Sequence, residues 1–242
     1  MKFRMLLLST ALCSAVFFGF PQHAAAQGVC SSDKQPHPVQ LIERFTNADC
    51  ATCWADPATA KPSPSALVLD WVTPGTQGDD APLSAVASVD AVQRLAALGQ
   101  NAPITSNVST TPVRPDRRLA RSTLRVARGL ALSGYIGASI ALKPVPTQGK
   151  ANVVTAWLAL VETLPAGLEG SPVERNLVRN VFQSRWNMPV KLSKTEQSQR
   201  FDQRSMSVAQ GANPERLQVI GWLTDERGHM LAAAQSVCTS AP

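Results

Sequence analysis

The spacing of the cysteines constrains the fold of this chain more than any other feature. Four of them lie beyond the apolar N-terminal segment, and they allow three pairings: Cys30, Cys50, Cys53 and Cys238. The gap of two residues between Cys50 and Cys53 makes a local bridge feasible. Cys30 would then meet Cys238 near the opposite end of the chain, since chain termini often lie close together. A four-cysteine zinc site is disfavoured, because it needs a second close pair. We therefore expect a structural Cys30–Cys238 disulfide.

Residues 1–26 have the features of a secretory signal peptide. Two basic residues precede an apolar stretch from Met5 to Phe20, and three alanines end the segment with a small-residue cleavage site. A membrane anchor is disfavoured, because this stretch of about 16 residues is shorter than the ~20 that span a bilayer. We expect an exported protein, periplasmic or secreted, with no stable membrane anchor after cleavage. Such a compartment is oxidising and favours disulfides over zinc.

Composition narrows the classes of protein further. A hydrophobic fraction of 44% supplies a packed core, and 18 prolines argue against a helical bundle. Loss of residues 1–26 removes Lys2, Arg4 and no acidic residue, so the formal charge falls from +6 to +4, too little to indicate nucleic-acid binding. His37 and His229 are the remaining histidines, which excludes a histidine-rich metal centre. Without a phosphate-binding glycine-rich loop or a Gly-x-Ser-x-Gly elbow, we expect neither metal nor cofactor.

The part of the chain from 39 to 130 alternates strand and helix signals. After an irregular lead-in over 27–38, the β-prone run Val39–Phe45 ends in a turn before Cys50. The other elements expected here are a helix over 65–72, a strand over 83–89 (or one helix over 83–98), a helix over 91–98 between Asp90 and Gly99, and a helix over 116–130.

The part from 131 to 242 is expected to be β-rich and sandwich-like. Residues 135–142 and 152–163 have strand composition and are separated by prolines, which suggests a hairpin. Residues 217–223 and 229–237 suggest a second hairpin, whereas 174–182 has the apolar spacing of a helix.

The local chemistry at Cys50 and Cys53 favours a redox dithiol. A cysteine that caps a helix beginning directly after a strand meets unpaired amides and the helix dipole, which stabilise a thiolate. A second cysteine one turn further on can attack the mixed disulfide formed by the first. A static bridge that ties the turn together is the alternative interpretation.

The segment Leu41–Asp56 resembles the opening of a family of uncharacterised secreted thioredoxin-like proteins, which have a Glu-x-Phe-Thr strand, Cys-x-x-Cys and an Ala-Asp pair. The resemblance implies an α/β thioredoxin-like domain over 39–130. It also implies that Glu43 belongs to the site and that Pro112 is a cis-proline facing the dithiol; a trans Pro112 in a proline-rich loop is the alternative interpretation. The chain departs from the family pattern after the second strand, where a His-x-Asp-Tyr-Trp-type segment is missing, and after Pro112, where Pro115 and arginines replace an apolar strand.

A basic run from Arg114 to Arg128 carries six arginines. On a helix, Arg117, Arg121, Arg125 and Arg128 would line one face. That face could bind an acidic partner or anionic lipid, or it could simply be solvated. Trp54 is expected to shield the dithiol from water.

Two functions follow from these expectations. The first is thiol–disulfide exchange on exported protein thiols or disulfides, with Cys50 as the nucleophile and Cys53 as the resolving thiol. The second is a non-catalytic binding or structural module with a fixed Cys50–Cys53 disulfide.

Overall fold

The computed structural model describes residues 30–63, 65–115, 117–146, 152–188 and 199–238. The expected signal peptide therefore lies outside the described residues. Two β-sheets and two α-helices dominate the described part of the chain. The strands are β1 (Cys30–Ser31), β2 (Gln40–Asn47), β3 (Ala66–Thr73), β4 (Ser106–Pro112), β5 (Thr123–Leu132), β6 (Tyr135–Lys143), β7 (Asn152–Leu164), β8 (Arg175–Met188), β9 (Arg200–Ser207), β10 (Leu217–Asp225) and β11 (Met230–Gln235). The helices are α1 (Ala51–Trp54) and α2 (Val89–Ala97).

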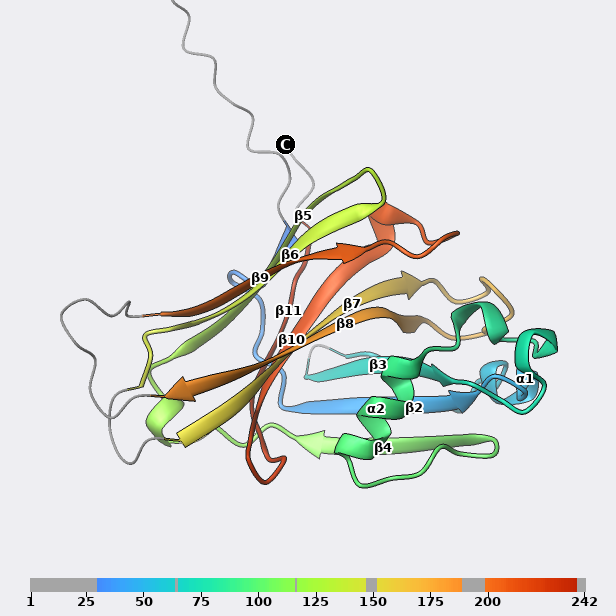
Figure 1. Cartoon of the computed structure of the whole chain (residues 1–242), viewed down its shortest axis with the longest axis horizontal. Helices are drawn as coiled ribbons and strands as arrows, with labels where there is room; N and C mark the ends of the chain where they lie inside the picture. Colours follow the sequence, from blue (N-terminus) through green and yellow to red (C-terminus); the bar gives the residue numbers. More distant parts are fainter. Residues whose placement is uncertain (1–29, 64, 116, 147–151, 189–198, 239–242) are drawn as a thin grey trace, which may run out of the picture.

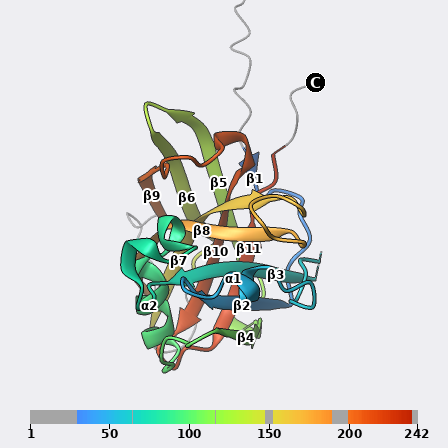
Figure 2. The ribbon, with the colours of Figure 1, turned by 90° about the vertical axis from the view of Figure 1, so that its right-hand side faces the viewer.

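The larger sheet has seven strands in the order β11-β10-β7-β8-β3-β2-β4, and the smaller has the order β1-β5-β6-β9 (Figures 1 and 2). The pairs β2–β3 and β3–β8 are parallel, and the other pairs are antiparallel. The boundary expected at residue 130 falls within β5, and the seven-stranded sheet contains strands from both sides of it.

Apolar side chains fill both faces of the seven-stranded sheet. One cluster lies between the two sheets and includes Val126 and Ile140 from the smaller sheet and Leu158 and Leu160 from β7. The sheets meet closely at Gly221 of β10, where an added Cβ would lie 2.5 Å from Cγ1 of Val126. The other face is covered in part by α2, whose Ala91 and Leu95 pack on residues of β2, β3 and β7.

The expected α/β thioredoxin-like fold is wrong, because the protein is mostly β-sheet. The segments expected as helices over 65–72, 116–130 and 174–182 lie mainly in β3, β5 and β8. Every residue of β3 is buried, so its sequence lacks the alternation that marks a half-exposed strand. The segment expected as a strand over 83–89 holds a single 3-10 turn at Ser84–Val86.

Other expectations are confirmed. Val39–Phe45 lies almost wholly in β2, and the hairpin over 217–237 is β10–β11. Helix α2 ends before Gly99, which has a φ of +68°, although its N-cap is Ser88 rather than Asp90. The hairpin expected from residues 135–142 and 152–163 is wrong: both segments form strands, but β6 pairs with β5 and β9 in one sheet, whereas β7 pairs with β8 and β10 in the other.

Candidate functional site

The Cys50–Cys53 disulfide lies where the carboxyl end of β2 passes into α1, at one end of the molecule (Figure 1). The backbone turns at Asn47, whose carbonyl accepts a hydrogen bond from the Cys50 amide at 2.9 Å. Cys50 is the N-cap of α1, and the Cys53 amide donates to its Sγ at 3.3 Å. Both cysteines are half-buried. The strand, turn, Cys-x-x-Cys and helix therefore occur in the expected order, and the disulfide remains accessible.

Helix α1 has only four residues. A single turn sums few peptide dipoles, so the expected dipole effect on Cys50 is small. The specific N–H···S hydrogen bond from Cys53 is the interaction that would stabilise a negative charge on the Cys50 sulfur after reduction.

Asp49 fixes the loop that lies beside the disulfide. Its carboxylate accepts hydrogen bonds from the amide and hydroxyl of Thr76, at 2.7 and 2.8 Å, and from the amide of Gln77 at 3.3 Å. Desolvation raises the pKa of Asp49, but the bonds from Thr76 and Gln77 outweigh it and hold that pKa below its usual value. Gly75 approaches so closely that an added Cβ would lie 2.0 Å from Oδ1 of Asp49.

Trp54 anchors α1 to the sheet. Its ring is buried with Val72 and Leu177, and its Nε1 donates to the carbonyl of Glu169 at 2.9 Å. Arg175 of β8 donates to the Trp54 carbonyl at 2.5 Å, and its guanidinium lies 4.6 Å from the centre of the indole ring. Trp54 thus fixes α1 to the sheet through these contacts. The sequence analysis expected it instead to shield the two cysteines from water.

A buried charge cluster of Arg44, Asp70 and Arg175 lies beneath the same turn. Asp70 forms ion pairs with both guanidiniums, at 3.0 Å to Arg175, and also accepts from the Asn176 amide at 2.8 Å. All three charged side chains are at most 2% exposed. Burial lowers the pKa of Arg175, and the nearby Asp70 opposes that shift. The Asp70 carboxylate is therefore the counter-ion of two buried guanidinium groups.

A pocket of about 190 Å³ opens beside Cys53. We call it the Cys53 pocket; its lining includes Cys53, Arg44, Arg175, Asp56, Thr59 and Asn107. The Nε of Arg44 is buried and has no hydrogen-bond partner among the described residues. Because this atom has almost no exposed surface, a molecule in the pocket would not reach it, and the polar side chains offered there include those of Asp56, Thr59 and Asn107.

The structure does not bring Glu43 to the disulfide. Glu43 is on the side of β2 that faces α2, where Arg94 donates to its two carboxylate oxygens at 2.8 and 2.7 Å and Trp71 donates at 3.2 Å. Glu43 is fully buried. Its four-residue separation from Asn47 places it roughly 13 Å before the turn that leads to Cys50. The structure gives Glu43 the position of a buried ion-pair partner.

Pro112 is also remote from the disulfide. It lies opposite Gln40, at the start of β2, whereas Cys50 follows the end of that strand. Seven residues of strand separate Gln40 from Asn47, or roughly 23 Å. Among the described residues the one cis peptide bond precedes Pro144. The expected cis-proline facing the dithiol is therefore wrong, because β4 pairs with β2 in the antiparallel direction.

The Cys30–Cys238 disulfide is present as expected and joins residues 208 positions apart. Next to it, Ser31 and Val237 form a β-bridge with backbone hydrogen bonds of 3.1 and 2.9 Å. Arg128 donates to Sγ of Cys238 at 3.1 Å. This disulfide ties the start of the described chain to its end. Two disulfides are compatible with a protein of an oxidising compartment.

The basic run does not form a helical face. Arg125 and Arg128 belong to β5, where Arg125 pairs with Asp33 on the surface. Arg128 is buried, and its Nε donates to the carbonyl of Leu217 at 3.0 Å. The expected arginine stripe is therefore wrong, because alternate strand residues point to opposite sides.

Sequence reasoning missed the charge cluster below the disulfide. The signal was a charged residue inside an apolar run, such as Asp70 in Leu-Val-Leu-Asp-Trp-Val. A buried charge in such a strand requires a partner of opposite sign. Within the described ranges, no group of histidine, cysteine or acidic side chains is placed to hold a metal ion. A search of the same residues for a helix of membrane-spanning length and hydropathy found none.

Comparison with known proteins adds little. No family model and no curated protein matches the chain. A solved structure, HBP35 of Porphyromonas gingivalis, is similar with a TM-score of 0.43 and 13% sequence identity, over 83% of this chain and 75% of that one.

Proposed function

We propose that the protein exchanges thiols and disulfides with other proteins through Cys50 and Cys53. The observation that carries the proposal is the hydrogen bond from the Cys53 amide to the Cys50 sulfur, made by a disulfide that is half-exposed at the end of a sheet. In the oxidised protein this bond caps α1. On reduction the same donor stabilises a thiolate at Cys50, which is the form that attacks a substrate disulfide.

The exchange proceeds through a mixed disulfide. In the reduced protein, the Cys50 thiolate attacks a substrate disulfide, forms a new S–S bond and releases one substrate thiolate. The Cys53 thiolate then attacks the Cys50 sulfur, closes the Cys50–Cys53 bond and releases the second substrate thiolate. Two electrons pass from the protein to the substrate, and the reverse sequence oxidises a substrate dithiol.

The surroundings of the disulfide support this chemistry. The contacts of Arg175 with the carbonyl and ring of Trp54 hold α1 in place while the S–S bond opens and closes. The Cys53 pocket offers polar groups to the part of the substrate next to its sulfur. Rigid support of this kind keeps the resolving thiol within reach of the mixed disulfide.

The segment 1–26 supports export, and the proposed substrates are therefore thiols and disulfides of exported proteins, in the periplasm or outside the cell.

Trapping of the mixed disulfide tests the proposal. A Cys53→Ala variant retains the nucleophile but cannot resolve, so it should accumulate covalent adducts with a scrambled or oxidised protein substrate that are released by reductant. The matched Cys50→Ala variant should accumulate far fewer. Equal trapping by the two variants, or none by either, would identify Cys50–Cys53 as a fixed bridge of a non-catalytic module.

A further inference from the structure

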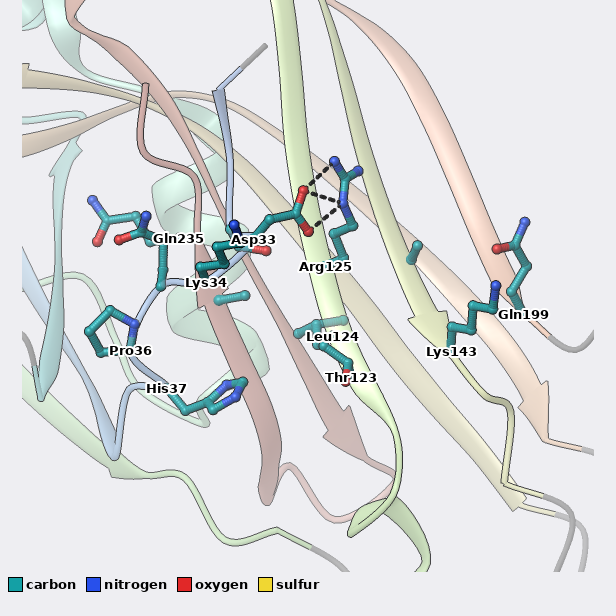
Figure 3. A pocket seen from close by; sticks show the side chains of 14 residues that line it. Asp33, Lys34, Pro36, His37, Thr123, Leu124, Arg125, Lys143, Gln199 and Gln235 are labelled. Atoms are coloured by element: carbon teal, nitrogen blue, oxygen red, sulfur yellow. Dashed lines mark hydrogen bonds and ion pairs between the residues drawn. The ribbon is translucent and has the colours of Figure 1, made fainter. Parts of the chain in front are cut away.

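A second site, separate from the Cys50–Cys53 turn, lies between the edges of β5 and β11. Residues 32–38 form a strap that runs past the edge of β5 and the outer edge of β11 (Figure 3). A pocket of about 390 Å³ touches the strap, Thr123 to Arg125 of β5, and Ala234 and Gln235 of β11. A second pocket of about 280 Å³ touches Leu231 to Ala233. Both pockets share His37 and Leu124, so they form one groove along β11, here called the β5–β11 groove.

The groove exposes the outer edge of β11 between Met230, whose carbonyl accepts from the Arg114 amide, and Val237. Val237 exchanges two backbone hydrogen bonds with Ser31, so its backbone faces away from β10. Gln235 and Ala233, two and four residues earlier, face the same way because the backbone direction alternates along a strand. Their amides and carbonyls form no hydrogen bond with the described residues on that side. An open strand edge of this kind is a template for one more strand.

The two ends of the groove differ in character. The larger pocket is lined by Lys34, Arg125 and Lys143 and by one carboxylate, that of Asp33, which Arg125 already binds at 2.7 Å. Lys34 lies at the end near Gln235, and Lys143 lies across the pocket beside Gln199 (Figure 3). The two lysines form no ion pair with the described residues and leave an excess of positive charge.

At the end near Leu231 the groove is lined mainly by apolar side chains, among them Pro38, Val113, Leu119 and Leu142. A ligand that matches both ends must therefore carry an acidic group where it meets the lysines and an apolar group where it meets the apolar side chains.

We propose that the β5–β11 groove binds an extended segment of a partner protein as an additional strand on β11. The segment carries an acidic side chain at the lysine end and a large apolar side chain about four residues away, which is the strand length from Gln235 to Leu231. Backbone hydrogen bonds to Ala233 and Gln235 provide affinity, and the two ends provide specificity. This site does not depend on the chemistry of Cys50 and Cys53.

A small peptide library tests the proposal. Ten-residue peptides in a threonine–valine background carry Glu or Lys at one position and Leu or Ser two to five positions further on. Fluorescence polarisation with the full protein should detect binding only by peptides with both Glu and Leu. Binding by none of the peptides, or equal binding by the Lys series, would overturn the proposal.

Matched variants separate the groove from general charge effects. Lys143→Glu should weaken binding of the best peptide roughly fivefold, because an exposed charge contact contributes up to about 1 kcal/mol. Lys61→Glu makes the same charge change at an exposed lysine outside the groove and should leave binding unchanged. Equal effects of the two variants would contradict the groove.

Backbone methylation tests strand addition itself. Two peptides are compared, one N-methylated at its odd-numbered residues and one at its even-numbered residues. In an added strand only one of these two sets of amides faces β11, so one methylated peptide should lose binding and the other should retain it. Loss of binding by both methylated peptides, or by neither, would show that no strand is added. If the free protein self-associates and Lys143→Glu abolishes that association, the occupant is a second copy of this chain, and the proposed partner is wrong.

Discussion

The buried charge cluster beneath the disulfide gives the sharpest test of the fold around the site. Asp70 is 1% exposed and accepts hydrogen bonds from Arg44, Arg175 and the Asn176 amide. The change Asp70→Asn keeps the volume but removes the single negative charge, so two buried guanidiniums lose their counter-ion. An uncompensated buried charge costs about 3–5 kcal/mol in the free energy of unfolding.

Urea denaturation of the oxidised protein measures this cost. With a slope of about 2 kcal/mol per molar urea, the midpoint should fall by about 2 M. The matched control is Asp33→Asn, which breaks an ion pair whose side chains are 53% and 43% exposed and should cost less than about 1 kcal/mol. If the two variants lower the midpoint equally, the cluster does not hold this end of the sheet, and our account of how α1 is supported fails.

Three further predictions concern close approaches and surface charge. Gly221→Val should lower the melting temperature by several degrees, because its Cβ would lie 2.5 Å from a methyl group of the facing sheet; an unchanged melting curve would show that the sheets are not in contact there. Gly75→Ala should displace the Asp49 carboxylate, since the new Cβ would lie 2.0 Å from it, and should alter the rate at which reduced Cys50 reacts with iodoacetamide; an unaltered rate would separate this loop from the site. The hydrogen bond from the β5 arginine lowers the pKa of Asp33, so this pair contributes stability above about pH 4 that is lost as the pH falls through the lowered pKa. The small stability difference between the protein and Asp33→Asn should therefore shrink as the pH is lowered below about 4; a difference that stayed constant on acidification would refute the ion pair.

Local signals predicted the parts of the structure that depend on near neighbours. The turn and spacing around Cys50 and Cys53 predicted a strand, a bridge and a helix in the correct order, and these are present. The pairing of Cys30 with Cys238 followed from elimination and is also present. Glycine at position 99 marked the end of α2, because a left-handed residue stops a helix.

Features that depend on distant neighbours could not be predicted from the sequence. Strand β3 is buried on both faces and reads as a helix, since burial removes the polar alternation on which strand prediction depends. The position of β4 in the sheet placed Pro112 beside Gln40 and far from Cys50, and no local signal encodes that register. Glu43 pairs with Arg94, 51 residues away, and Asp70 pairs with Arg44 and Arg175, 26 and 105 residues away, so these ion pairs could not be predicted before the fold was known.

The reduction potential of the Cys50–Cys53 bond decides between thiol–disulfide exchange and a fixed bridge. Equilibration with glutathione buffers, followed by mass mapping of the two disulfides, measures it while Cys30–Cys238 serves as an internal structural reference. We predict a potential above about −300 mV and a reduced Cys50 that is alkylated readily at neutral pH. A potential below that value, with Cys50 unreactive, would contradict thiol–disulfide exchange.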